Sequence, residues 1–406
     1  MTGAAAHAVT SAPRRGATPR IESIDLLRGL VMVLMALDHS RDFFGDFAAR
    51  PTDLATTTAA LFCTRWVTHL CAPTFFLLTG TGAYLARARL SAPQLSRFLL
   101  ARGAWLLVLE LVVMRFALQF NLDYQLTIIT VLWALGWSMI VLAGVSRLPL
   151  WGIAAFGMAL VAGHNALDGL APGMAADPGP LGRLWIVLHQ PGTLFHGSHA
   201  LVHVSYVLIP WVGVTALGYV LGAIYEWSAV RRRKLLLHLG IGLIAAFVVL
   251  RFSNLYGDPA LWSRQSSAAW TVMSFINTTK YPPSLLFLLM TLGPALLLLR
   301  AFDGGVPAWL RPLATLGKVP LFFYVLHIFL IHLLAVVASY VRYGEVSEVF
   351  RSPDLGHFPF SAPPDWNLGL PFVYLVWVVV VIALYPLCRW YAGLRQRRRA
   401  WWLSYL

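Results

Sequence analysis

Residues 370–390 read LPFVYLVWVVVVIALYPLCRW, a run of 21 residues in which Arg389 carries the only charge. A helix of about 20 apolar residues, rising about 1.5 Å per residue, crosses the roughly 30 Å hydrocarbon layer of a bilayer. Residues 126–145 form a second such run without any charged side chain. Both stretches therefore predict helices that span a membrane.

Apolar stretches of this kind recur along almost the whole chain of 406 residues, of which 58% are hydrophobic and only 12% are charged. This composition excludes an ordinary water-soluble domain. It predicts an all-α fold, a polytopic membrane helix bundle of about ten transmembrane helices. The expected spans are Leu26–Phe44, Trp66–Leu85, Phe98–Leu118, Leu126–Val145, Leu148–Leu167, Leu201–Ile224, Leu235–Phe252, Leu285–Leu299, Leu313–Val341 and Leu370–Trp390.

The basic residues between these spans indicate which side of the membrane each connection faces. Alternating spans place about 21 of the 31 Lys and Arg residues on one side, which the positive-inside rule makes cytoplasmic. Both termini then face the cytoplasm, and we expect an integral membrane protein. The net charge of +14 therefore reflects the membrane topology. It does not indicate nucleic-acid binding, because the cations form short clusters and no continuous basic face.

The chain is expected to hold a single membrane domain over residues 21–394. Residues 1–20, rich in Ala, Thr, Pro and Arg, indicate a disordered cytoplasmic tail, and residues 395–406 indicate a basic one. The longer polar connections all fall on the outer face, where a polar ligand would be handled. They are residues 50–64, 168–199, 253–283 and 342–367.

The first span carries ionisable residues at both ends, in Asp25-Leu-Leu-Arg28 and again in residues 38–42. On one helix, Arg28 and His39 lie within about 20° of the same face and about 16 Å apart along the axis. Asp25, one turn before Arg28, is placed to orient the guanidinium. Because charge inside a membrane is costly, both ends are expected to face a functional cavity.

The outer end of the first span and the start of the second concentrate further ionisable groups. Arg28 and His39 also have a different interpretation, in which Arg28 obeys the positive-inside rule and His39 lies at the level of the lipid headgroups. His69, one turn after Arg65, is either a second acid or base or a residue that packs between helices. The groups concerned are Asp38, His39, Arg41, Asp42, Arg65 and His69.

Several stretches resemble a known family. They are Ile21 to Tyr84, Leu208-Ile-Pro-Trp-Val-Gly-Val-Thr-Ala-Leu-Gly-Tyr219, Asn277-Thr-Thr-Lys280-Tyr-Pro-Pro-Ser-Leu-Leu-Phe287 and Leu316-Gly-Lys318-Val-Pro-Leu-Phe-Phe-Tyr324-Val-Leu-His327. Together they resemble bacterial membrane proteins with a heparan-α-glucosaminide N-acetyltransferase-like catalytic domain, in the transmembrane acyltransferase superfamily. Arg28 followed by His39 also resembles the arginine and histidine motif of bacterial membrane O-acyltransferases.

The resemblance implies a transmembrane acyltransferase of the bacterial cytoplasmic (inner) membrane. Acetyl-CoA, or another short acyl-CoA, would enter from the cytoplasm, and its acyl group would pass to an amino or hydroxyl group of a sugar or glycan at the outer face. The lysosomal enzyme of the family carries its catalytic histidine between the first two spans, whereas residues 48–62 here contain none. The role therefore falls to His39 through the second motif.

Acyl transfer from a thioester needs a base, groups that stabilise the oxyanion and a site that excludes water. His39 is the expected base, since imidazole has an unperturbed pKa of about 6.5. Asp42 lies within one turn of His39 and is the better candidate to orient the ring, whereas Asp38 would take that place if the helix end frayed.

The donor would lie at the cytoplasmic end. Arg28 and Lys318 are candidates for the CoA phosphates, which favour Arg forks and Lys point charges, and Asp25 supports Arg28. The separation of about 16 Å between Arg28 and His39 suits the extended arm between the CoA phosphates and the thioester.

The acceptor would lie among the outer loops and the ninth expected span. Asn254 and Asp258 belong to Asn-Leu-Tyr-Gly-Asp-Pro, which is equally typical of a turn that satisfies its own backbone. The candidates for acceptor binding are Arg41, Arg65, Asn254, Asp258, Lys280, Tyr281, Tyr324 and His327.

A histidine-rich run raises the question of a metal. His196, His199 and His203 would face one side if residues 196–203 were helical. No carboxylate lies nearby in sequence and Gly197 weakens a helix, so no metal is expected and an interfacial histidine cluster is favoured.

Two other functional classes stay open. A transporter or flippase would use the buried charges for binding or relay without covalent chemistry, whereas a non-catalytic scaffold would leave them unexplained. Small residues such as Gly80 and Gly82 permit close helix packing, within one chain or in a homodimer. The expected partners are membrane lipid, acyl-CoA and a sugar or glycan acceptor.

Overall fold

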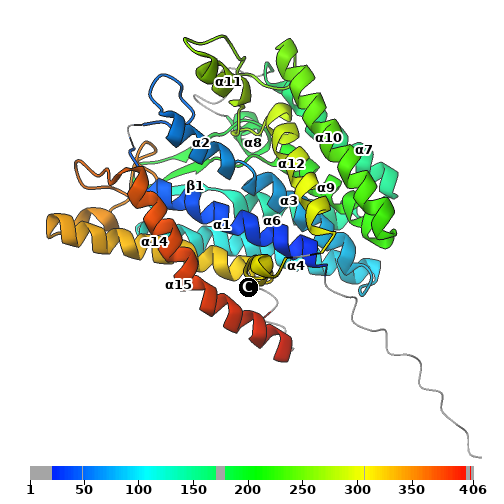
Figure 1. The fold of residues 1–406 in the computed structure, drawn as a ribbon. Coiled ribbons are helices and arrows are strands. Elements are labelled where there is room, and N and C mark those ends of the chain that lie inside the picture. The colour runs from blue at the N-terminus through cyan, green and yellow to red at the C-terminus, as the bar shows by residue number, and fades with distance from the viewer. Residues whose placement is uncertain (1–20, 48, 171–178, 306, 399–402, 404–406) are drawn as a thin grey trace, which may run out of the picture.

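The computed structural model describes residues 21–47, 49–170, 179–305, 307–398 and 403. The expected tail at 1–20 lies outside these residues. About 70% of the structure is helical. Figure 1 shows these helices packed against one another. Seven helices of the described part are long and apolar enough to cross a membrane, so the prediction of a membrane helix bundle is confirmed in its class, while the count of ten stays a prediction.

Each of the seven candidate spans overlaps one expected stretch, and most of them extend beyond its expected ends. The first combines α2 (Ala59–Thr68) and α3 (Cys71–Ala86). The others are α7 (Leu150–Gly163) with η2 (His164–Leu167), α9 (Leu208–Gly222) with η3 (Ala223–Glu226), α10 (Ala229–Ser253), α12 (Leu285–Phe302), α14 (Pro320–Tyr343) and α15 (Gly369–Arg397).

Three further expected spans are also mainly helical. The first is α1 (Glu22–Phe44), and the second runs through α4 (Ala92–Val108), the π-helix η1 (Leu109–Met114) and α5 (Arg115–Gln119). The third is α6 (Val131–Val145), which is only 15 residues long. Short helices complete the bundle: α8 (Pro180–Leu188), α11 (Ala268–Ile276), η4 (Ala308–Leu310), α13 (Arg311–Gly317) and η5 (Ser347–Phe350).

A small sheet departs from the all-α expectation. Strand β1 (Leu126–Ile129) pairs in parallel with β3 (Leu201–Val204), and β2 (Gly192–His196) pairs antiparallel with β3. The first residues of two expected spans are thus strands. Short apolar runs rich in β-branched residues suit a strand as well as a helix, and pairing between the distant runs decides the outcome here.

The same sheet excludes the helix considered for the histidine-rich run. Residues 196–203 are not helical, because His196 ends β2 and His203 lies in β3. The described residues contain no group of three or more His, Cys, Asp or Glu side chains arranged to hold a metal ion.

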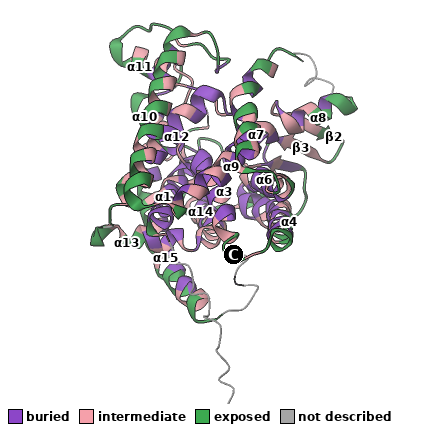
Figure 2. Cartoon of the chain, turned by 90° about the vertical axis from the view of Figure 1, so that its right-hand side faces the viewer, coloured by how far each residue is buried: buried purple, intermediate pink, exposed green. Residues whose placement is uncertain are grey.

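Helix α1 lies at the centre of the bundle, in contact with α2, α3, α12, α13, α14 and α15. Figure 2 shows buried residues concentrated around α1, α3 and α9. By contrast, only 22% of the most apolar stretch of α10 is buried, and the same percentage holds for α15. These two helices expose long apolar faces, as expected for helices that contact lipid.

One end of the bundle brings the start of α1, α13 and the end of α15 together. A Cβ atom on Gly29 would lie 1.8 Å from the carbonyl oxygen of Leu313, so α1 and α13 touch backbone to backbone. Arg395, near the end of α15, donates a hydrogen bond to the carbonyl of Lys318 at 3.1 Å. We call this region the basic end. Helix α15 continues to Arg397, so the first residues of the expected C-terminal tail are helical.

Candidate functional site

The larger cavity of the site has a volume of about 800 Å³ and lies at the end of the bundle opposite the basic end. We call it the outer cavity. Side chains from α1, α2, α14, the small sheet and three of the long polar connections line it. Its ionisable and phenolic lining residues are Asp38, His39, Arg41, Asp42, Arg50, Arg65, His203, Tyr206, Lys280, Tyr281 and Tyr324.

His39 faces this cavity with 25% of its side chain exposed. Its Nδ1 lies 3.5 Å from Oδ2 of Asp42, one helical turn further along α1. The ring of His327 lies 5.2 Å from that of His39, centroid to centroid, and the ring of Tyr324 lies 6.5 Å away, edge on. His39 is thus flanked by a carboxylate on its own helix and by two α14 side chains.

Asp38 has a different environment from Asp42. Arg65 of α2 donates a hydrogen bond to its Oδ2, and Arg41 forms an ion pair with its Oδ1 at 2.9 Å. Thr68 also donates to Oδ1, at 2.9 Å. Asp38 therefore joins α1 to α2, and the carboxylate nearest His39 is Asp42.

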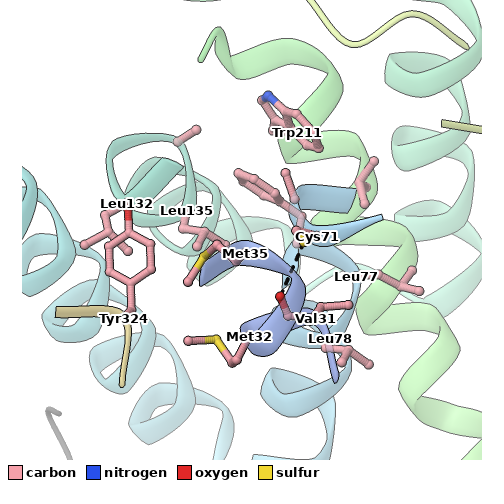
Figure 3. Packing of buried hydrophobic residues seen from close by; sticks show 14 of the residues in the cluster. Val31, Met32, Met35, Cys71, Leu77, Leu78, Leu132, Leu135, Trp211 and Tyr324 are labelled. Atoms are coloured by element: carbon pink, nitrogen blue, oxygen red, sulfur yellow. Dashed lines mark hydrogen bonds between the residues drawn. The ribbon is translucent and has the colours of Figure 1, made fainter. Parts of the chain in front are cut away.

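A second cavity, of about 320 Å³, opens at the basic end. We call it the inner cavity. Its walls are largely apolar and include Met32, Leu132, Leu135 and Tyr324, which Figure 3 labels among the buried side chains. The cationic side chains that line it are Arg28, Arg102, Lys318 and Arg395.

The two cavities meet. Phe75, Val131 and Tyr324 line both of them, and we call these three residues the junction. Helix α1 runs alongside, with Arg28 in the inner cavity and His39 in the outer one. Since α1 is one uninterrupted helix, the distance of about 16 Å along its axis between these residues holds.

Arg28 is oriented by two contacts at the basic end. Its Nη1 donates to Oδ1 of Asp25 and to the carbonyl oxygen of Gly317, each at 3.3 Å. The second contact links α1 to the residue before Lys318. The close approach of Gly29 to α13 thus holds Arg28 and Lys318, two of the four cations of the inner cavity, near each other.

The loop after α11 brings Lys280 and Tyr281 to the outer cavity. The Lys280 ammonium lies 5.2 Å from the centre of the Tyr281 ring. Burial raises the pKa of Tyr281, but Lys280 and Arg65 outweigh it and hold that pKa below its usual value. Two positive side chains thus stand close to the Tyr281 hydroxyl group in this wall of the cavity.

Asp258 supports this loop from behind. Its carboxylate accepts hydrogen bonds from the backbone and hydroxyl groups of Thr279, at 2.9 and 2.8 Å, and from Ser284 at 2.7 Å. Asn254 bonds the backbone of Trp262 through both side-chain groups. Neither side chain lines the outer or the inner cavity, and both have the local bonding of turn residues.

Two histidines named from the sequence also lie off the cavity surface. His69 packs against Phe287, with ring centroids 5.3 Å apart. Nδ1 of His327 bonds the carbonyl oxygen of Phe323 at 3.0 Å, so His327 lies behind His39 and does not line the outer cavity.

Comparison with known proteins bears on this geometry. The sequence profile described as "Heparan-alpha-glucosaminide N-acetyltransferase, catalytic" matches residues 20–253, more than half of the chain. The chain belongs to that family. The match to this heparan-alpha-glucosaminide N-acetyltransferase family covers α1 through α10, and so includes Arg28, His39 and Arg65. A search of curated proteins found no match.

With seven candidate spans and this family, the chain is an integral membrane protein. Lys318 and Tyr324 lie beyond the matched residues, yet the structure brings them to the same two cavities as Arg28 and His39. The cavities of this heparan-alpha-glucosaminide N-acetyltransferase family member thus draw on both halves of the chain.

Several cavity residues were missed from the sequence. Arg102 and Arg395 sit in basic stretches that the positive-inside rule already explains, so nothing marked them out. Tyr206 was hidden in an expected membrane helix, and His203 was considered only as part of the histidine-rich run. Only the register of β3 and the turn after it bring them to the outer cavity.

Proposed function

We propose that the protein is a membrane-embedded acyltransferase that moves an acetyl or other short acyl group from acyl-CoA in the inner cavity to a sugar or glycan in the outer cavity. The observation that carries this proposal is the pair of cavities that share Phe75, Val131 and Tyr324, with Arg28 in one and His39 in the other. Membership of a family named for N-acetyl transfer supports it. In this account the inner cavity faces the cytoplasm of a bacterium and the outer cavity faces the periplasm.

The inner cavity suits the donor. CoA carries its phosphates at one end and its thioester at the other, joined by an extended arm. The four cations at the basic end would bind the phosphates, since Arg offers paired donors and Lys a compact charge. The arm would lie along the apolar walls, and the thioester would reach the junction beside Tyr324 and His39.

The outer cavity supplies the groups for transfer. His39 would take a proton from the acceptor amine or hydroxyl as its nitrogen or oxygen attacks the thioester carbonyl. The carbon–sulfur bond then breaks, and the departing thiolate takes the proton back from His39. Asp42, 3.5 Å from Nδ1, would orient the ring. Tyr324 at the junction would donate a hydrogen bond from its hydroxyl group to the oxyanion.

Acceptor binding would fall to the rest of the outer cavity. Arg41, Lys280 and Tyr281 present donors toward its interior from two sides. Arg65 combines a cavity position with the buried pair to Asp38, so it would bind acceptor and hold the wall together.

A transporter is the second candidate, because two cavities that open at opposite ends of a bundle also suit alternating access. Purified protein in lipid nanodiscs, given acetyl-CoA and a panel of amino sugars and sugar alcohols, separates the two. Acceptor-dependent release of CoA supports transfer. Absence of acetyl-CoA binding, together with solute uptake into proteoliposomes without CoA, supports transport and overturns the proposal.

A further inference from the structure

Glu110 is the one charged residue of the apolar segment Leu109–Met114, and the function proposed above does not use it. It lies in η1, the π-helical segment between α4 and α5, and only 4% of its surface is exposed. Buried carboxyl groups in membrane helices are costly, and π-helical turns recur at functional sites. The burial of Glu110 in a π-helical segment therefore requires an explanation.

The contacts of Glu110 point to α6. Its Oε1 accepts hydrogen bonds from the backbone N–H of Thr130 at 2.5 Å and from the Thr130 hydroxyl at 2.6 Å. Thr130 immediately precedes α6, and its own side chain makes no capping bond to that helix. The carboxyl group of a neighbouring helix therefore caps α6, at the end where helix dipoles favour negative charge.

This cap lies directly behind the junction. Thr130 lines the outer cavity, and the next residue, Val131, lines both cavities. The strand β1 ends at Ile129, so the chain changes from strand to helix at the bonded residue. Glu110 thus fixes the point at which the chain enters the wall shared by the two cavities.

We propose that Glu110 is a positioning residue: by holding Thr130, it sets Val131 at the junction and so controls how the donor thioester meets the acceptor. The catalytic half of this inference rests on the function proposed above. The structural half concerns the junction alone and does not depend on any reaction.

Glu110→Leu removes the acceptor of both hydrogen bonds, whereas Glu110→Gln keeps a carbonyl oxygen for them. We expect Glu110→Leu to lower kcat by about 10- to 100-fold, the usual cost of reacting groups misplaced by an ångström or less. The Kd of acetyl-CoA should change less than about threefold, because the four cations stay in place. Glu110→Gln should restore most of kcat.

Two further variants bracket this effect. Thr130→Val removes the side-chain hydrogen bond and keeps the backbone one, so it should fold even if Glu110→Leu does not, and should lower kcat by an intermediate factor. Val112→Ala is the matched control, since Val112 lies in the same π-helical segment with 53% of its surface exposed. It should leave kcat unchanged.

A labelling experiment tests the junction without any turnover. Val131→Cys is introduced into a variant in which all three native cysteines, Cys63, Cys71 and Cys388, are replaced by Ser, and its reaction with a small methanethiosulfonate reagent is followed. We expect Glu110→Leu and Thr130→Val to change the labelling rate at least fivefold, and Glu110→Gln to leave it near that of the parent.

The outcomes separate the two proposals. Altered labelling in a protein that transfers no acetyl group would overturn the proposed function and keep the role of Glu110 at the junction. Normal acetyl transfer with labelling and kcat unchanged in Glu110→Leu and Thr130→Val would overturn the role of Glu110. Equal loss in Glu110→Gln and Glu110→Leu would also overturn it, because hydrogen-bond acceptance would not be the property that matters.

Discussion

Arg65 of α2 donates a hydrogen bond to Asp38 of α1, and both side chains are nearly buried, with 11% and 12% of their surfaces exposed. Arg41 and Thr68 complete the coordination of the same carboxylate. Asp38 and Arg65 both line the outer cavity, and Asp38 directly precedes His39 in the sequence. The pair therefore links the stability of the first two helices to the shape of the site.

Breaking this pair should destabilise the protein strongly. Arg65→Leu leaves Asp38 buried with fewer partners, which costs about 3–5 kcal/mol in the free energy of unfolding. Thermal unfolding in detergent measures the loss. Arg50→Leu, at an exposed residue of the same cavity, is the control and should change stability little. The double variant Arg65→Leu, Asp38→Leu should be more stable than Arg65→Leu alone, and additive losses would contradict this account.

The inner cavity should bind the CoA phosphates. Arg28→Ala and Lys318→Ala are each expected to weaken acetyl-CoA binding about tenfold or more, since each removes a charge-assisted contact. Isothermal titration calorimetry of the purified protein with acetyl-CoA measures this Kd. Arg233→Ala, an exposed cation that does not line the inner cavity, should leave the Kd unchanged. An unchanged Kd for Arg28→Ala would refute the phosphate role.

The contact of α1 with α13 should tolerate no added methyl group. A Cβ atom at position 29 would lie 1.8 Å from the Leu313 carbonyl oxygen, so Gly29→Ala must push the helices apart. We expect a lower unfolding temperature and weaker acetyl-CoA binding, because Arg28 and Lys318 would separate. Gly144→Ala, with open space at its Cβ, should preserve both properties. A Gly29→Ala protein as stable as wild type would show that the contact is looser.

Asp258 should act on the acceptor through the loop that it holds. Asp258→Ala removes the acceptor of the Thr279 and Ser284 hydrogen bonds, so it should raise the KM for the acceptor and also lower stability by about 1–3 kcal/mol. Lys280→Ala should raise that KM without the loss of stability. If Asp258→Ala raises KM while stability stays intact, Asp258 contacts the acceptor directly.

The positions of the helices and the ionisable residues at both ends of α1 could be predicted from the sequence, because the patterns that indicate them are local. Apolar runs of spanning length mark the helices, and the spacing of Arg28 and His39 follows from helical geometry alone. Asp42 was likewise preferred over Asp38 as the neighbour of His39, and the structure places it there. The engagement of Asp38 by Arg65 was not foreseen.

The parts that the sequence could not reveal depend on contacts between distant segments. Strand β1 forms because Leu126 meets Leu201, and no local pattern encodes that pairing. Glu110 drew no attention, since a single acid in an apolar run carries no motif, and its partner Thr130 is 20 residues away. Asp258 looked like a ligand or a turn residue, and only its bonds to Thr279 and Ser284 show what it holds.

The most direct test of the account compares wild type with His39→Ala in acceptor-dependent release of CoA from acetyl-CoA, alongside acetyl-CoA binding to both proteins. The account predicts that His39→Ala loses at least about 100-fold in kcat, as for removal of a general base, while its Kd for acetyl-CoA stays near that of wild type. Acetyl transfer by His39→Ala at the wild-type rate would contradict it.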